Sequence, residues 1–145
     1  MPEFHDSLIA RAPVEEVWKL LYDPTRFPQW WQGVGSVDDI ALDHDTDPAV
    51  EPGTQTTGYT MYPEDYPDFP MPQLLGSDCG AGTVTISCLV SDLRFEWRLQ
   101  AVESGTEISA HVRIPEAEAR RLADQATAVR LSLRRLADLA AAPPP

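Results

Sequence analysis

Four polar side chains lie on strand-like segments and have the types needed for general acid–base chemistry: His5, Glu96, Arg98 and His111. Glu96 and Arg98 are two residues apart, so they share one face of a strand, and His111 falls in the next strand-like segment. An imidazole, a carboxylate and a guanidinium held close together shift one another's pKa values, as catalytic groups require. Each of these residues alternates with apolar ones. The pattern therefore leaves open whether this polar face is solvated or lines a polar cavity.

Metal and cofactor motifs are incomplete. Residues 43–47, Asp-His-Asp-Thr-Asp, resemble the start of a calcium loop. Pro48 stands where that loop needs glycine, and Thr54 stands where it needs a bidentate acid. Cys79 and Cys88 have neither CxxC spacing nor a second pair, which argues against zinc. Glycine-rich phosphate loops and hydrolase motifs are absent from the sequence. We therefore predict no metal site and no cofactor.

The charge distribution restricts the partners. The chain carries a net charge of −12, and residues 27–93 contain no lysine or arginine at all. Such a surface repels phosphate backbones and anionic lipid, so we expect no nucleic-acid partner. No run of 18 apolar residues occurs, so we expect no membrane insertion. The N-terminus lacks the basic region of a secretory signal, which predicts a cytoplasmic protein with reduced thiols.

The 145 residues fit a single domain, 1–145, with a short proline tail at 143–145. Residues 115–142 are predicted to form one long helix, because one apolar stripe recurs at spacings of three and four. The stripe consists of Leu122, Ala126, Val129, Leu133, Leu136 and Ala140. A helix with so narrow a stripe needs a surface to pack against.

The rest of the chain supplies that surface. Strands are predicted at 3–11, 34–42, 53–62, 83–90, 93–102 and 106–114, and short helices at 14–22 and 25–31. Residues 63–82 are interpreted as a long, proline-rich connection that could act as a lid, or that contains a short element around Gln73 to Ser77. Two short helices after the first strand, a curled antiparallel sheet and one long C-terminal helix define an α+β class.

This order resembles the START-like superfamily, the helix-grip proteins also called SRPBCC, with its polyketide cyclase/dehydrase and lipid-transport branch. The residues that carry the resemblance are Ala12, Pro13, Val14, Glu15, Glu16, Val17, Trp18, Leu21, Asp23, Trp30, Gly53, Gly105 and Thr106, with the terminal helix. The resemblance implies a hydrophobic cavity between the sheet and the long helix. Members include lipid carriers, aromatic polyketide cyclases, hormone binders and chaperone activators.

Several apolar side chains are expected to converge under the helix and bind a ligand. These candidates are Trp31, Tyr59, Met61, Phe69, Trp97, Leu122, Ala126 and Val129. Ala119 and Ala126 are small where a filled core would favour leucine, which predicts space beneath the N-terminal half of the helix. The alternative is a fully packed core, for which aromatic stripes are typical. The adjacent Trp30 and Trp31 suit either a core plug or a pocket wall.

Three functions follow as hypotheses. The first is binding of a small hydrophobic, lipid- or polyketide-like molecule in that cavity, with the protein a monomer or a homodimer. The second is a polyketide aromatase/cyclase-type enzyme that uses a polar cavity residue, for which His111, Glu96 and Arg98 are the catalytic candidates. The third is an acidic protein-interaction module.

Overall fold

The computed structural model describes residues 2–43, 55–78, 80–89 and 93–141. The acidic run at 44–47, Gly53 and Cys79 lie outside these ranges. The strands are β1 (Glu3–Ala10), β2 (Val34–Asp43), β3 (Gln55–Pro63), β4 (Met71–Asp78), β5 (Thr83–Cys88), β6 (Arg94–Val102) and β7 (Gly105–Arg113). The helices are α1 (Val14–Leu21), η1 (Pro24–Arg26), α2 (Phe27–Trp30), η2 (Glu116–Arg121) and α3 (Leu122–Ala141).

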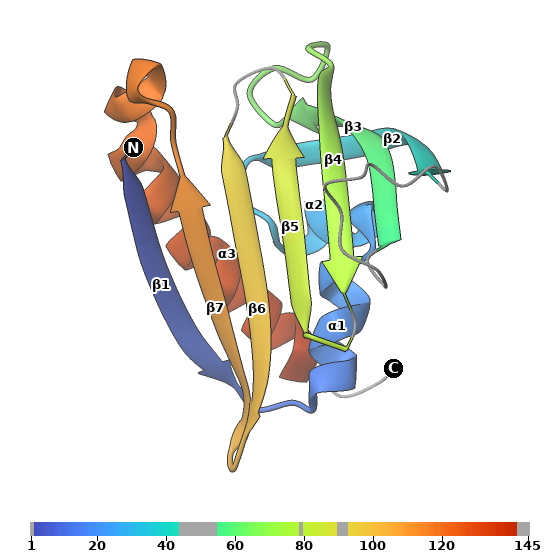
Figure 1. Cartoon of the computed structure of the whole chain (residues 1–145), viewed down its shortest axis with the longest axis vertical. Coiled ribbons are helices and arrows are strands. Elements are labelled where there is room, and N and C mark those ends of the chain that lie inside the picture. Colours follow the sequence, from blue (N-terminus) through green and yellow to red (C-terminus); the bar gives the residue numbers. More distant parts are fainter. Residues whose placement is uncertain (1, 44–54, 79, 90–92, 142–145) are drawn as a thin grey trace.

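The described strands form one antiparallel seven-stranded sheet in the order β1-β7-β6-β5-β4-β3-β2. The chain starts at one edge with β1, crosses through α1 and α2 to the other edge, and returns strand by strand to β7. The sheet curls, and α3 runs behind β1, β7 and β6 (Figure 1). The expected α+β architecture, a curled sheet around a long C-terminal helix with short helices after the first strand, is confirmed.

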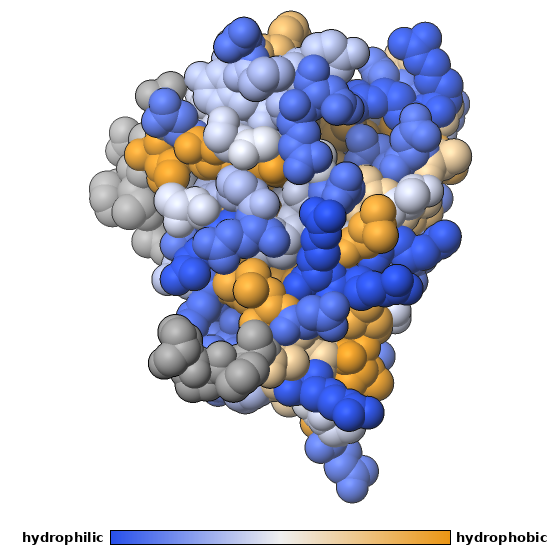
Figure 2. Space-filling model, turned by 180° about the vertical axis from the view of Figure 1, so that it is seen from behind, coloured by the Kyte–Doolittle hydropathy of each residue, from blue (hydrophilic) through white to orange (hydrophobic). Residues whose placement is uncertain are grey.

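The apolar stripe of α3 faces the sheet. Val129, Leu133, Leu136 and Ala140 are buried, and Leu122 packs against the core from a partly buried position. From the helix side the surface is mainly hydrophilic, with separate hydrophobic patches (Figure 2). No helix in the described ranges has the length and hydropathy needed to cross a membrane.

The start of the long helix differs from the prediction. Residues 116–121 form the 3-10 helix η2, and the α-helix begins only at Leu122. Three-residue turns are common at helix N-termini, where the first N–H groups have no intrahelical partner. Because the turn is tighter, side chains in this segment point in other directions than a continuous α-helix would give them.

The largest difference lies in the segment expected to be a connection. Residues 71–78 form β4, which pairs with β3 on one side and β5 on the other. Its inward residues are Gln73, Leu75 and Ser77, all buried. Two of these three are polar, so the sequence lacks the apolar–polar alternation that marks a half-buried strand. Pro72 also argues against a central strand. The connection between β3 and β4 is correspondingly short, residues 64–70.

Gly105 allows the end of β1 to approach the start of β7 closely. It opens β7 with φ of 149°, and a Cβ placed there would collide with the carbonyl oxygen of Ala10. The next residue, Thr106, donates its hydroxyl to the carbonyl oxygen of Ala12 at 2.8 Å. Backbone contact at this point needs glycine, because any side chain would separate the two strands.

Candidate ligand-binding site

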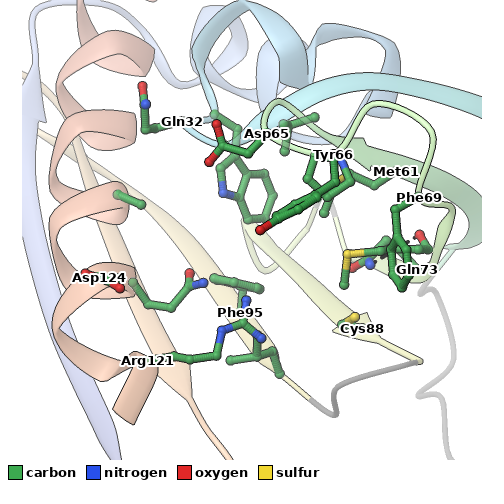
Figure 3. A pocket seen from close by; sticks show the side chains of 18 of the residues that line it. Gln32, Met61, Asp65, Tyr66, Phe69, Gln73, Cys88, Phe95, Arg121 and Asp124 are labelled. Atoms are coloured by element: carbon green, nitrogen blue, oxygen red, sulfur yellow. Dashed lines mark hydrogen bonds between the residues drawn. The ribbon is translucent and has the colours of Figure 1, made fainter. Parts of the chain in front are cut away.

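A cavity of about 530 Å³ lies between the sheet and the N-terminal half of α3. Its volume is within the range of small-molecule pockets, and most of its lining is apolar. The residues that line it are Trp31, Gln32, Gly33, Val34, Tyr59, Met61, Pro63, Asp65, Tyr66, Phe69, Met71, Gln73, Cys88, Leu93, Phe95, Arg121, Asp124, Gln125 and Ala128. Figure 3 shows the side chains converging from the sheet, the 64–70 connection and α3.

The two adjacent tryptophans have different environments. Trp30 is fully buried, and its indole N–H donates to the carbonyl oxygen of Leu20 at 2.9 Å, which fixes α2 against α1. Trp31 lines the cavity and meets Phe95 edge-on, with ring centroids 5.0 Å apart. Trp30 is therefore core and Trp31 is pocket wall, so each of the two interpretations applies to one residue.

A buried hydroxyl of α3 holds the segment after Trp31. The backbone N–H of Gln32 donates to the Ser132 hydroxyl oxygen at 2.9 Å, and that hydroxyl donates to the carbonyl oxygen of Ala128 at 2.7 Å. Gly33 follows with a positive φ of 100°, a conformation that turns the chain into β2. These contacts set the distance between the Trp31 wall and the helix wall.

The helix wall is polar. Arg121, Asp124, Gln125 and Ala128 all line the cavity. The Arg121 guanidinium lies 3.7 Å from the carboxylate of Glu118, one turn earlier. Figure 3 shows Arg121 extending from the helix side toward the sheet, where Gln73 and Cys88 lie. The cavity therefore has a charged helix wall and an uncharged sheet wall.

The structure brings half of the predicted ligand residues together. Trp31, Tyr59, Met61 and Phe69 line the cavity. The other four do not contribute to its described lining: Trp97 and Val129 are fully buried, and Leu122 and Ala126 are partly buried. Apolar residues of the helix face the sheet, because packing there removes their side chains from water. The neighbouring helix face, which borders open space, carries the polar residues.

Sequence reasoning missed the polar lining, chiefly Gln32, Gln73, Asp65 and the helix residues. One signal was available, because residues 121, 124, 125 and 128 follow the same three-and-four spacing as the apolar stripe, one face further round. Gln73 had no such periodic signal, because an element around Gln73 to Ser77 was only one interpretation of the long connection.

The acid–base candidates lie on the other side of the sheet. His111, Glu96 and Arg98 alternate with buried residues of β6 and β7, so their side chains point away from α3 and the cavity. His111 Nε2 lies 3.3 Å from a carboxylate oxygen of Glu3, and Arg98 lies 3.4 Å from that of Glu96. The His5 and His111 rings meet edge-on at 5.1 Å. The polar cavity face that the catalytic hypothesis needed is therefore not formed by these residues.

The described residues contain no group of three or more histidine, cysteine, aspartate or glutamate side chains arranged to hold an ion. Cys88 is buried in the cavity wall. Of the calcium-loop-like run at 43–47, residues 44–47 lie outside the described ranges.

Comparison by sequence identifies no relative: no family model matches the chain, and no curated protein matches it. Comparison by structure finds proteins with a similar fold. A structural-genomics protein of Nitrosomonas europaea superposes with a TM-score of 0.67 at 17% identity, over 94% of this chain and 92% of its own. The Zhui aromatase/cyclase from Streptomyces sp. R1128 gives a TM-score of 0.65 at 13% identity, over 96% and 93%.

A third similar structure is the di-domain ARO/CYC BexL from the BE-7585A biosynthetic pathway, with a TM-score of 0.68 at 19% identity. The match covers 99% of this chain and 51% of BexL, so the chain spans about half the length of that protein. At these identities the likeness concerns the fold. The chain has a helix-grip α+β fold.

Proposed function

We propose that the protein binds a small hydrophobic molecule in the cavity between the sheet and α3. The observation that carries the proposal is the cavity itself, about 530 Å³ of mostly apolar space beside Trp31 and Phe95. A packed core leaves few voids larger than a water molecule, so an empty space of this size costs the protein packing contacts. Binding of an apolar ligand restores the lost contacts.

The ligand class follows from the walls. Aromatic rings of Trp31, Tyr66, Phe69 and Phe95 border the space and offer faces and edges to a ring-containing molecule. Aromatase/cyclases among the similar structures make a polyketide-like ligand a specific version of the proposal. A lipid-like molecule is the other version, and the two differ in the shape of the apolar part.

Thermal-shift screening with fatty acids, flavonoids and polyketide mimics tests the proposal. A ligand at about 100 times its Kd stabilises the folded state by about 2.7 kcal/mol, which raises the Tm by several degrees. Ala128 lines the cavity, whereas Ala123 is exposed on the same helix. Ala128→Phe should therefore abolish the shift and Ala123→Phe should retain it. If no hydrophobic ligand raises the Tm, the proposal is wrong.

An aromatase/cyclase-type enzyme remains the second candidate, supported by the similar structures that carry this activity in their names. In such an enzyme the pocket would orient a flexible chain, and a polar cavity residue would assist proton transfer. Side chains that line the cavity, such as Asp65, Tyr66 and Asp124, replace the outer-face residues as candidates. Incubation with a linear poly-β-ketone mimic, followed by mass spectrometry for loss of water, distinguishes turnover from binding.

A further inference from the structure

The sheet wall of the cavity carries a row of three polar side chains on adjacent strands. In the antiparallel register Tyr59 of β3 pairs with Gln73 of β4, and Gln73 pairs with Cys88 of β5. Directly paired residues point to the same face with their Cβ atoms about 5 Å apart, so the three form one continuous row. All three line the cavity, and they are only 5%, 4% and 4% exposed.

Two members of this row, Tyr59 and Gln73, have hydrogen-bonding capacity that the described part of the protein leaves largely unused. Within the described part of the chain, no hydrogen bond uses the Tyr59 hydroxyl. The Gln73 side-chain N–H donates to the carbonyl oxygen of Met71, at a long 3.4 Å. Most buried polar side chains have good partners, so two poorly engaged ones side by side in a cavity wall call for an occupant of the cavity.

The row also lies in an environment that disfavours charge. Strands β3, β4 and β5 fall within residues 27–93, which contain no lysine or arginine. The cation that lines the cavity, Arg121, sits on the opposite helix wall and pairs with Glu118. Burial, with a smaller contribution from Cys88, raises the pKa of Tyr59 well above its ordinary value. A carboxylate placed against this wall would lose its hydration without gaining a counter-charge.

We propose that Tyr59, Gln73 and Cys88 form a hydrogen-bonding subsite for a neutral oxygen group, a hydroxyl or a carbonyl, on a ring-containing apolar ligand. This inference rests on the proposed function of the same cavity and specifies the chemistry of its ligand. The Tyr59 hydroxyl and the Gln73 amide each donate and accept, so together they can engage either oxygen type. The apolar body of the ligand would then lie between the row and the Trp31 and Phe95 rings.

Three probes that share one ring system test the subsite: 2-naphthol, 2-methylnaphthalene and 2-naphthoate. Their Kd values are measured at pH 7 by tryptophan fluorescence, with the wild type and with Tyr59→Phe. In the wild type, 2-naphthol should bind about 2–10-fold more tightly than 2-methylnaphthalene, the range expected for one net hydrogen bond. 2-Naphthoate should bind least tightly. Tyr59→Phe should remove the advantage of 2-naphthol and leave 2-methylnaphthalene unchanged.

A matched control is Tyr62→Phe, because Tyr62 lies on the same strand as Tyr59 but is not part of the cavity lining. It should leave the naphthol preference intact. Gln73→Met is the second variant at the row, and it should also reduce the preference for 2-naphthol. It replaces Tyr59→Phe if that variant is too unstable to measure. Equal affinities for 2-naphthol and 2-methylnaphthalene in the wild type, or tightest binding of 2-naphthoate, would overturn the subsite while leaving the cavity as a binding site. Failure of every hydrophobic ligand would instead refute the proposed function.

Discussion

Ser132 and Gln32, one hundred positions apart, are joined by a 2.9 Å hydrogen bond from the Gln32 backbone N–H to the Ser132 hydroxyl oxygen. Ser132 is completely buried in α3, and Gln32 follows the cavity residue Trp31. The bond connects two walls of the cavity, so the Ser132 hydroxyl helps to hold them at their distance.

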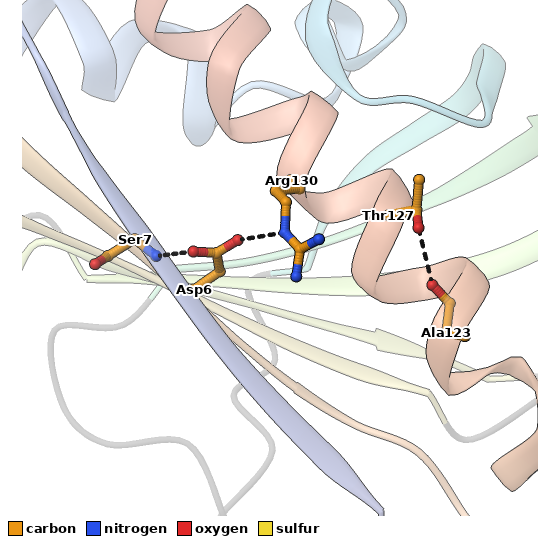
Figure 4. Close-up of polar contacts among 5 residues, drawn as sticks. All are labelled: Asp6, Ser7, Ala123, Thr127 and Arg130. Atoms are coloured by element: carbon orange, nitrogen blue, oxygen red, sulfur yellow. Dashed lines mark hydrogen bonds and ion pairs between the residues drawn. The ribbon is translucent and has the colours of Figure 1, made fainter.

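Ser132→Ala should therefore lower the free energy of unfolding by about 1–3 kcal/mol, because the Gln32 N–H loses its partner in a part-buried position. Thr127→Ala is the matched control. The Ser132 hydroxyl donates to the carbonyl oxygen of Ala128, four residues earlier. The Thr127 hydroxyl donates in the same way to the carbonyl oxygen of Ala123 at 3.1 Å, but on the exposed side of α3 (Figure 4). That change should stay within about 0.5 kcal/mol. Urea denaturation measures both, and equal effects would contradict the bridging role.

Gly105→Ala should destabilise the fold strongly. Its positive φ costs about 1–3 kcal/mol for a residue with a Cβ, and that Cβ would also collide with the Ala10 carbonyl oxygen. Gly58→Ala serves as the control, since a Cβ at Gly58 meets nothing within 4 Å. Thermal unfolding should show a large drop in Tm for the first variant and little change for the second. Similar Tm values for the two variants would show that the fold tolerates separation of β1 from β7.

The ion pair between Asp6 of β1 and Arg130 of α3 should contribute little. Its N–O distance is 3.3 Å, but the Arg130 side chain is 72% exposed (Figure 4). Exposed pairs of this type contribute about 0–1 kcal/mol and are screened by salt. Asp6→Asn should change the free energy of unfolding by less than about 1 kcal/mol, with a smaller difference at 1 M NaCl. A loss above 2 kcal/mol, unchanged by salt, would indicate that this pair anchors the helix.

Stability should fall at alkaline pH through Tyr59. Burial raises its pKa in the folded state, so above the unfolded pKa of about 10 the unfolded chain loses this proton first. Each further pH unit then favours unfolding by up to about 1.4 kcal/mol, until the folded-state pKa is reached. Tyr59→Phe should flatten this decline between pH 10 and 11 and have no effect on its slope between pH 7 and 9. Identical slopes for the two proteins in urea titrations would contradict the burial of a neutral hydroxyl.

Most elements of the fold could be predicted from the sequence, because their periodicity is local. β6 and β7 alternate apolar and polar side chains, and the stripe from Leu122 to Ala140 repeats at helical spacing. In both cases one face of the element is buried and the opposite face is in contact with solvent along its whole length. The apolar residues therefore mark the buried face directly. β4 was expected only as an alternative, a short element around Gln73 to Ser77, because Gln73 and Ser77 face inward, where the pattern expects apolar residues.

The cavity lining depends on tertiary structure. Local pattern assigned Val129 and Trp97 to the ligand, whereas the structure buries both and turns Asp124, Gln125 and Ala128 to the cavity. It also places His111 on the outer face of the sheet, away from any cavity chemistry.

Apart from β4, the sequence by itself determined the order of the elements and the face that each one buries, and it determined the absence of positive charge from the middle of the chain. Only the tertiary structure decided where burial leaves a space, and that Tyr59, Gln73 and Cys88 stand beside one another along it. The physical reason is that burial is a property of each element, whereas a cavity is a mismatch between elements. Its lining follows from strand register and helix placement, which no local periodicity encodes.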